Sequence, residues 1–309
     1  MGGQLDPAFA ALLSDPRVAL RRPPPGISIE EVRVAANRFL AKAPRPPIYS
    51  MVDHSVGTLG GPLKLRLYRP SPEPGLPIIL FVHGGGFILG NLETHDAMAR
   101  ELANRANAVI VAVDYRLAPE HPFPAALDDC ISALDWVRNQ AAALAVDPSR
   151  ISLAGDSAGG QLAVATALRC SGSGTRLRHV ALLYPLLDPH RASPSAQKLA
   201  EGYMLTGSFI AWAWSSYRGG PDAADSPLFD VGHAVLDNFP PTTIVTAFFD
   251  PLRDEGKAFA GRLSLAKVPV ELKCYNGMIH GFAGFPQITP AANDAINFLA
   301  QRLASSFAE

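Results

Sequence analysis

The residues best suited to do chemistry are a serine and the two glycines around it. The stretch Gly-Asp-Ser-Ala-Gly at residues 155–159 follows a short apolar run at residues 151–154 and precedes a helical pattern of apolar residues. A G-x-S-x-G sequence between a strand and a helix is typical of a nucleophile elbow, a sharp turn that projects a serine hydroxyl. A glycine-rich turn with Ser157 as a helix cap is the structural alternative. The pattern favours Ser157 as the nucleophile of an acyl-transfer reaction.

A glycine-rich loop earlier in the chain favours the same chemistry. The apolar run at residues 78–82 is followed by a His-Gly-Gly-Gly sequence that contains Gly85 and Gly86. Acyl transfer places negative charge on the former carbonyl oxygen, and glycine backbone can direct unobstructed N–H groups at that charge. We expect an oxyanion hole formed by the amides of Gly85, Gly86 and Ala158, the last at the positive end of a helix. The histidine of the sequence, His83, is expected to brace the loop.

A histidine and an aspartate further along the chain are candidates for the base and the acid that a serine nucleophile needs. On a fold with a nucleophile elbow the chain order is serine, acid, histidine, which excludes every histidine before Ser157. Among the later ones, only His280 follows the last predicted strand and precedes the last helix. Asp250 comes directly after a strand predicted at residues 243–249, whereas Asp254 opens a helix and is expected to complement its dipole. The predicted triad is Ser157, Asp250 and His280.

Strands and helices that alternate along the chain must bring these residues together. A period-two apolar pattern at residues 63–67 opens the alternation in residues 48–187, and the alternation resumes in residues 226–309. Short apolar runs bounded by glycine, proline or aspartate suit strands that are buried on both faces of a parallel sheet. Thr289 and Pro290 mark the start of the final helix. We predict an α/β fold with a mainly parallel sheet flanked by helices and with reactive groups beyond the carboxyl ends of its strands.

Two segments fall outside this alternation. Residues 1–47 carry short helical patterns broken by a Pro-Pro-Pro-Gly sequence and are expected to form an appendage to the core. Residues 188–225 are predicted to form an inserted helical lid. Phe209, Trp212 and Trp214 of this lid are expected to pack in the core or to line an acyl pocket that binds substrate. Basic residues are not interleaved with these aromatic residues, which disfavours a stacking platform for nucleic acid.

Taken together, the motifs resemble the hormone-sensitive-lipase-like branch of the α/β-hydrolases, known among bacterial esterases as family IV. This resemblance implies a carboxylesterase for short or medium acyl chains that needs no metal or organic cofactor. It supports the triad and implies a helical cap made of the N-terminal helices and residues 188–225. Members often have an acidic residue two positions before the triad aspartate, where this chain has Phe248. The matching stretches are residues 83–86, 114–125, 155–160, 250–254 and 279–282.

The stretch at residues 115–125, which belongs to this resemblance, is expected to brace the glycine-rich loop that carries Gly85 and Gly86.

Other motifs and the same triad allow alternatives to ester hydrolysis. Ser195 and Lys198 match the S-x-x-K signature of penicillin-binding proteins, but the companion S-D-N and K-T-G sequences are absent. A non-catalytic small-molecule-binding protein on the same fold is an alternative that the complete predicted triad disfavours. An acyltransferase or amidase with the same triad stays open.

The bulk composition excludes several other classes of protein. Of the 309 residues 48% are hydrophobic, and 27 basic residues nearly balance 28 acidic ones for a net charge of −1. This composition is typical of a globular chain and lacks the charge expected of a nucleic-acid-binding protein. The sequence has no run of 18 consecutive apolar residues, so no membrane-spanning helix is predicted. Its three cysteines are far apart and expected to be buried, which indicates neither disulfides nor a zinc site. No secretion signal is evident, so we expect a cytoplasmic protein whose partner is a small-molecule ester; a homodimer stays open.

Overall fold

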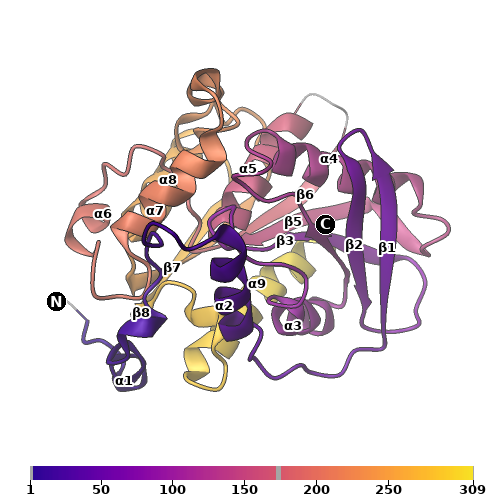
Figure 1. The fold of residues 1–309 in the computed structure, drawn as a ribbon. Coiled ribbons are helices and arrows are strands. Elements are labelled where there is room, and N and C mark those ends of the chain that lie inside the picture. Colours follow the sequence, from indigo (N-terminus) through magenta and orange to yellow (C-terminus); the bar gives the residue numbers. More distant parts are fainter. Residues whose placement is uncertain (1–2, 172–174, 309) are drawn as a thin grey trace.

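The computed structural model of the protein describes residues 3–171 and 175–308, in which eight strands form one sheet (Figure 1). In order across the sheet, the strands are β1 (Ser50–Thr58), β2 (Gly61–Arg69), β4 (Val109–Asp114), β3 (Leu76–Val82), β5 (Val146–Asp156), β6 (Leu177–Leu183), β7 (Thr242–Phe249) and β8 (Val270–Ile279). The pairs β1–β2 and β2–β4 are antiparallel, and all later pairs are parallel. The predicted mainly parallel sheet is therefore confirmed.

Helices cover both faces of this sheet (Figure 1). On one face lie α3 (Asp96–Ala106) and α9 (Pro290–Ser306), and on the other lie α4 (Ala125–Asn139), α5 (Ala158–Cys170) and α8 (Arg253–Leu265). The side chains of β3 show why both covers are needed. Ile78, Leu80 and Val82 enter one hydrophobic core, whereas Ile79 and Phe81 enter the other. Because side chains alternate along a strand, a wholly apolar strand is stable only between two apolar layers.

The predicted start of the last helix and the strand at residues 63–67 are confirmed. Thr289 caps α9 by accepting a hydrogen bond from the Ala291 N–H, and residues 63–67 lie within β2. The sheet nevertheless begins one strand earlier, because β1 forms a hairpin with β2. Val56 is the one buried residue of β1, so this strand lacks the apolar alternation that marks strands in the sequence. Main-chain pairing with β2, rather than side-chain burial, holds β1 in the sheet.

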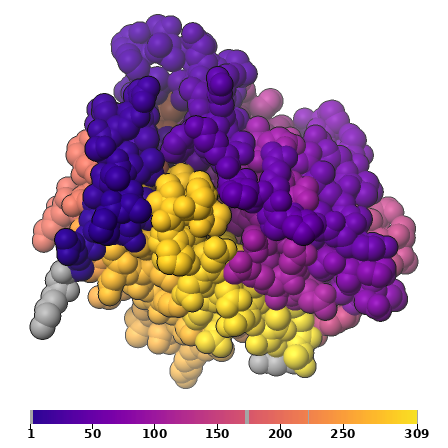
Figure 2. Space-filling view, turned by 90° about the horizontal axis from the view of Figure 1, so that it is seen from below, coloured from indigo at the N-terminus to yellow at the C-terminus, as the bar shows by residue number. Residues whose placement is uncertain are grey.

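The N-terminal segment packs more closely on the core than the sequence indicated. It contains α1 (Pro7–Leu13), η1 (Pro16–Val18) and α2 (Ile29–Leu40). Phe9 is fully buried, with its ring 6.1 Å from that of Phe285, so the expectation of an appendage outside the core is wrong for this residue. Arg33 donates hydrogen bonds to the carbonyl oxygens of Ile88 and Ala118. Figure 2 shows the indigo N-terminal atoms beside the yellow C-terminal part of the chain.

The segment between β6 and β7 is helical, as expected for a lid. It contains α6 (Pro194–Lys198), α7 (Gly207–Arg218), η2 (Pro221–Asp225) and η3 (Val231–His233), while the remaining short helix, η4 (Phe282–Gly284), follows β8. This segment contacts the N-terminal segment directly. The Leu20 N–H donates to the Met204 carbonyl oxygen at 2.7 Å, and the Thr206 hydroxyl donates to the Leu20 carbonyl oxygen at 2.6 Å. Two segments far apart in the sequence are thus joined beside the sheet.

The helices and the cysteines bear on two expectations drawn from the composition. Within the described part of the chain, no helix combines the length and the apolar character needed to cross a membrane. Cys130 and Cys170 are buried, as expected for small hydrophobic residues, but Cys274 is exposed. Cys274 lies on β8, the last strand of the sheet, where one side chain in two faces away from the core.

Candidate active site

Ser157 occupies the sharp turn between β5 and α5. Its backbone has φ 52° and ψ −119°, a strained conformation for a residue other than glycine. The turn also brings two backbones together, since a Cβ atom on Gly159 would lie 2.0 Å from the Val82 carbonyl oxygen. The side chain of Ser157 makes no capping hydrogen bond to α5, which excludes the alternative of a serine helix cap. The G-x-S-x-G spacing therefore satisfies a steric demand of a nucleophile elbow.

Asp250 and His280 reach Ser157 from the ends of two neighbouring parallel strands. Asp250 follows β7 and His280 follows β8, so both lie at the carboxyl edge of the sheet. The His280 Nδ1 atom lies 2.8 Å from Asp250 Oδ2, and His280 Nε2 lies 2.9 Å from Ser157 Oγ. With the carboxylate as acceptor, Nδ1 donates its proton and Nε2 is left to accept one from the serine hydroxyl. The structure thus brings together the three residues that the sequence predicts as a triad.

Burial increases along this line of contacts. Ser157 is 8% exposed, His280 is 5% exposed and Asp250 is fully buried. Asp250 also accepts a hydrogen bond of 2.8 Å from the Leu252 N–H, which orients its carboxylate. The edge of the Tyr184 ring meets the imidazole of His280, with centroids 4.8 Å apart. Packing and hydrogen bonds therefore hold the imidazole in one orientation, with one end toward the interior and the other toward Ser157.

The glycine loop lies beside the serine. Gly85 and Gly86 have φ values of +122° and +62°, and both line the same cavity as Ser157. A Cβ atom on Gly86 would lie 2.8 Å from the ring of Phe209. Ala158 is the first residue of α5, where backbone N–H groups have no acceptor within the helix. The three amides predicted for an oxyanion hole therefore belong to a loop and a helix start that adjoin Ser157.

The expected brace of this loop is present. The Tyr115 hydroxyl donates to the His83 carbonyl oxygen at 2.9 Å, and the two rings stack with centroids 4.3 Å apart. The Ala118 N–H donates to the Phe87 carbonyl oxygen at 2.9 Å. Burial, together with the charge of the nearby His95, lowers the pKa of His83 to about 3, so this imidazole is neutral near pH 7. These contacts agree with a bracing role for His83 and for residues 115–125.

A second connection between the elbow and the glycine loop runs through Asp156, a residue that the sequence motifs do not mark. Asp156, next to the serine, accepts a hydrogen bond of 2.8 Å from the Gly84 N–H, and the same Oδ1 atom lies 3.2 Å from His95 Nε2. Burial disfavours the ionised form of Asp156, but His95 and the Gly84 N–H outweigh burial and lower its pKa. A buried anion therefore ties the two loops together. The sequence does contain a signal for this connection, because Asp156 is an acidic residue in a turn whose other residues are all small.

An apolar cavity opens beside Ser157. Its empty space, including the opening to solvent, is about 1040 Å³. The N-terminal segment contributes Leu20 and Leu40 to its apolar lining, and the insertion contributes Met204 and Phe209. The core helices α3 and α9 contribute Met98 and Ile296. Both segments that the sequence set apart from the alternating core therefore border the cavity.

Of the three aromatic residues expected to bind substrate, the structure places only Phe209 on this cavity. Trp214 is buried instead in an aromatic cluster, with ring centroids 5.3 Å from Phe87 and 5.1 Å from Phe229. Trp212 is partly exposed and meets the edge of Phe209. Trp214 therefore takes the expected alternative of core packing, and the substrate-binding role considered for the two tryptophans is not supported, because neither lines the cavity. Trp214 follows Phe209 by five residues and so lies on a different face of α7, whereas Trp212 lies about one turn from Phe209 and contacts its ring from the outer side.

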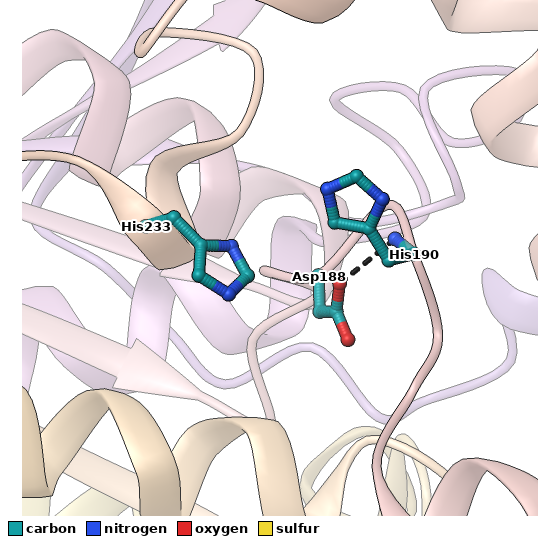
Figure 3. Close-up of side chains that lie close together, drawn as sticks. All are labelled: Asp188, His190 and His233. Atoms are coloured by element: carbon teal, nitrogen blue, oxygen red, sulfur yellow. Dashed lines mark hydrogen bonds between the residues drawn. The ribbon is translucent and has the colours of Figure 1, made fainter.

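One group of potential metal ligands lies outside this cavity. Within the described residues it consists of Asp188, His190 and His233 (Figure 3). None of these residues lines the cavity, and none belongs to the predicted triad.

Comparison with known proteins assigns these features to a family. Residues 79–284 match a family described by the alpha/beta hydrolase fold. The chain is 42% identical over 243 residues to the carboxylesterase NlhH of Mycobacterium tuberculosis, and this alignment covers 75% of each protein. It is 36% identical over 261 residues to an arylesterase of Saccharolobus solfataricus, with 84% of this chain and 85% of the relative covered.

A solved structure extends this similarity to nearly the whole chain. The hyperthermophilic esterase from the archaeon Pyrobaculum calidifontis superposes with a TM-score of 0.91, at 37% sequence identity and with 98% of each chain covered. The fold and the cavity-lining elbow define the class as carboxylic ester hydrolases with an α/β-hydrolase fold. Within that class, the chain belongs to the hormone-sensitive-lipase-like family of esterases.

Proposed function

We propose that the protein is a serine carboxylesterase that hydrolyses short- to medium-chain esters through an acyl-enzyme intermediate. The observation that carries this proposal is the line of contacts from Asp250 through His280 to Ser157 at the wall of an apolar cavity. A serine nucleophile needs a base within hydrogen-bond reach, and that base needs an acceptor to hold its tautomer. The distances of 2.9 Å from His280 Nε2 to Ser157 Oγ and of 2.8 Å from His280 Nδ1 to Asp250 Oδ2 support both requirements.

In the acylation step, Ser157 Oγ attacks the ester carbonyl carbon while His280 Nε2 takes the hydroxyl proton. Asp250 stabilises the imidazolium through the Nδ1–H bond. Negative charge develops on the former carbonyl oxygen, which accepts hydrogen bonds from the amides of Gly85, Gly86 and Ala158. The C–O bond then breaks, and His280 returns the proton to the leaving alcohol. Each amide of such a hole is worth about 3 kcal/mol of the barrier.

In the deacylation step, the same imidazole activates a water molecule. Neutral His280 removes a proton from the water as its oxygen attacks the acyl carbon of the acyl-enzyme. The amides again hold the oxyanion, and the proton passes to Ser157 Oγ as the acyl–oxygen bond breaks. The carboxylic acid leaves and the free serine is restored. The buried Asp156 supports both steps, because its bond to the Gly84 N–H keeps the oxyanion loop in place before substrate arrives.

The substrate class follows from the wall of the cavity. We assign residues 1–47 and 188–225 to a cap over an α/β-hydrolase core formed by residues 48–187 and 226–309. Side chains of both cap segments, such as Leu20 and Phe209, line the cavity. Each buried methylene group of an acyl chain gains about 0.8 kcal/mol, so activity is expected to rise with chain length until the chain outgrows the cavity.

The test is the hydrolysis of p-nitrophenyl esters from acetate to palmitate by the wild type and by Ser157→Ala. We expect kcat to fall by about 10⁵-fold or more in the variant, because the acyl-enzyme cannot form. Ser305→Ala, which removes an exposed hydroxyl from α9, is the matched control and is expected to keep full activity. Retention of most activity by Ser157→Ala would overturn the assignment of the nucleophile. Faster hydrolysis of the palmitate ester than of the butyrate ester would overturn the assignment of short- to medium-chain substrates.

The acyl acceptor needs a separate measurement, since an acyltransferase or an amidase would use the same triad. The enzyme is given p-nitrophenyl butyrate in the presence of an added alcohol or amine, and the acyl products are then identified. A hydrolase releases mainly butyric acid under these conditions. Transfer of most acyl groups to the added alcohol or amine would identify an acyltransferase, and faster turnover of the matching anilide would identify an amidase.

A further inference from the structure

Two histidines and two aspartates cluster outside the cavity, and three of these four side chains are drawn in Figure 3. Asp188, His190 and His233 each offer one ligand atom, and these three atoms lie within 4.8 Å of one another. The carboxylate of Asp230 adjoins them, with Oδ2 3.1 Å from His190 Nε2 and Oδ1 2.9 Å from His233 Nδ1. Four side chains of the types that bind metal ions therefore meet at one place, and none of them lines the cavity beside Ser157.

The cluster joins two segments that are distant in the sequence. Residues 188–190 begin the insertion a few residues after β6, which ends at Leu183, and residues 230–233 lie a few residues beyond the end of the insertion and before β7. The Gly232 N–H donates to the Leu187 carbonyl oxygen at 3.3 Å, so the two segments also touch through their backbones. The cluster therefore lies where the insertion begins and ends.

One of the ligand side chains is already oriented. Asp188 is only 9% exposed, and its two carboxylate oxygens accept the N–H groups of His190 at 2.8 Å and of Ala192 at 3.0 Å. The imidazoles of His190 and His233 are 66% and 63% exposed, so they have room to rotate. A fixed carboxylate with two adjustable imidazoles can close around an ion without moving the backbone.

We propose that Asp188, His190 and His233 form a binding site for a divalent transition-metal ion of the Zn²⁺ type. Neutral imidazole nitrogen and carboxylate oxygen are the ligands that suit Zn²⁺ in proteins. Ligand bonds of 2.0–2.2 Å in a tetrahedral site place the ligand atoms about 3.3 Å apart, which rotation of the exposed imidazoles can reach. A histidine that binds a metal through one ring nitrogen usually donates the N–H of its other ring nitrogen to a carboxylate or carbonyl group. Asp230, which contacts both imidazoles, is the carboxylate that would accept such an N–H here.

An ion at this site would hold the two ends of the insertion together. The Leu186 N–H donates to the Ser157 carbonyl oxygen at 3.0 Å, so the loop that leads from β6 to the site also contacts the nucleophile elbow. At the other end, the Gln161 amide of α5 donates to the Phe229 carbonyl oxygen at 3.1 Å. Metal binding is therefore expected to stabilise the attachment of the insertion to the core. The ion takes no part in ester hydrolysis, so it should leave the order of acyl-chain preference unchanged.

Zinc binding to the untagged full-length chain tests this proposal. The protein is treated with a chelator, dialysed, and titrated with ZnCl₂ by equilibrium dialysis and calorimetry. We expect one Zn²⁺ per chain, and affinity at least about tenfold weaker in both His190→Ala and His233→Ala. At zinc concentrations far above the dissociation constant, the Tm of the wild type should rise by about 3 °C or more, and Mg²⁺ should have no such effect.

Matched variants separate this site from other zinc-binding groups. His54→Gln removes a histidine of β1 outside the cluster, and Ser157→Ala removes the proposed nucleophile; both should bind Zn²⁺ like the wild type. Folding of the two cluster variants is checked by circular dichroism and by hydrolysis of p-nitrophenyl butyrate. The absorption spectrum of bound Co²⁺ gives a second measurement, and its visible bands should disappear in either cluster variant. Absence of saturable binding up to about 1 mM Zn²⁺, or wild-type affinity in either cluster variant, would overturn the proposal.

Discussion

The nucleophile elbow and the proposed cap, residues 1–47 and 188–225, border the same cavity, but different constraints hold them. In the elbow, backbone atoms approach so closely that a Cβ atom on Gly159 would lie 2.0 Å from a carbonyl oxygen. In the cap, a Cβ atom on Gly26 or Gly202 would meet nothing within 4 Å. The cap is held by apolar contacts and by a few hydrogen bonds such as that between Leu20 and Met204. This difference indicates that cap residues can change, and with them the preferred ester, without disturbing the chemistry at the elbow.

The largest expected effect comes from changing the elbow and the cap separately. His280→Gln should lower kcat by about 10⁴-fold or more for every ester, because no base remains for the serine. Phe209→Ala should keep kcat for the preferred ester within about tenfold and shift the acyl-chain preference toward longer or bulkier esters. Both variants are assayed with p-nitrophenyl esters of increasing chain length. A uniform loss of kcat in Phe209→Ala, with unchanged acyl-chain preference, would contradict the separate roles of the elbow and the proposed cap.

A second comparison lies within α7, between a buried and a partly exposed tryptophan. Trp214→Ala should lower the free energy of unfolding by about 3–5 kcal/mol, because it leaves a cavity between Phe87 and Phe229. Trp212→Ala, at a partly exposed position, should cost less than about 2 kcal/mol. Urea unfolding gives the free energies, and neither variant should reorder the acyl-chain preference. A changed preference in Trp214→Ala would show that this residue contacts substrate after all.

Acid should act on the sheet and its loops rather than on the cap. Burial lowers the pKa of His83 to about 3 and that of His179, in β6, to about 4. Between pH 6.5 and 5 the unfolded chain binds a proton at each position and the folded chain does not, so stability decreases as the pH falls. Each histidine should cost about 2 kcal/mol over this window. His179→Gln should remove about half of the decrease measured by urea unfolding, and an unchanged decrease would contradict this assignment.

The smallest expected effect concerns the attachment of the N-terminal segment. Arg33→Met removes hydrogen bonds from α2 to the carbonyl oxygens of Ile88 and Ala118 and should cost about 1–2 kcal/mol of unfolding free energy. It should also raise KM more than it lowers kcat, because α2 contributes Leu40 to the cavity. Arg17→Met, which removes only an exposed ion pair, is the matched control and should change neither quantity. An equal loss of stability in both variants would show that Arg33 does not anchor the segment.

The parts that sequence reasoning predicted correctly are those that depend on neighbours in the chain. The elbow, the strand with residues 63–67 and the cap of the last helix by Thr289 follow from spacing and steric rules over a few residues. The sequence gives no strand signal for β1, because its side chains are mostly exposed, and it wrongly predicts that Phe9 lies outside the core. Both errors concern segments whose structure depends on a partner elsewhere in the chain.

The same distinction applies to the functional residues. By itself, the sequence determined which side chains could serve as nucleophile, acid and base, because parallel strands must end at one edge of the sheet and chain order leaves few candidates. Tertiary structure alone decided that Asp156 binds the Gly84 N–H, that Trp214 turns into the core, and that His190 meets His233. These contacts join segments separated by many residues. Their geometry depends on how whole elements pack, and no pattern within one segment encodes it.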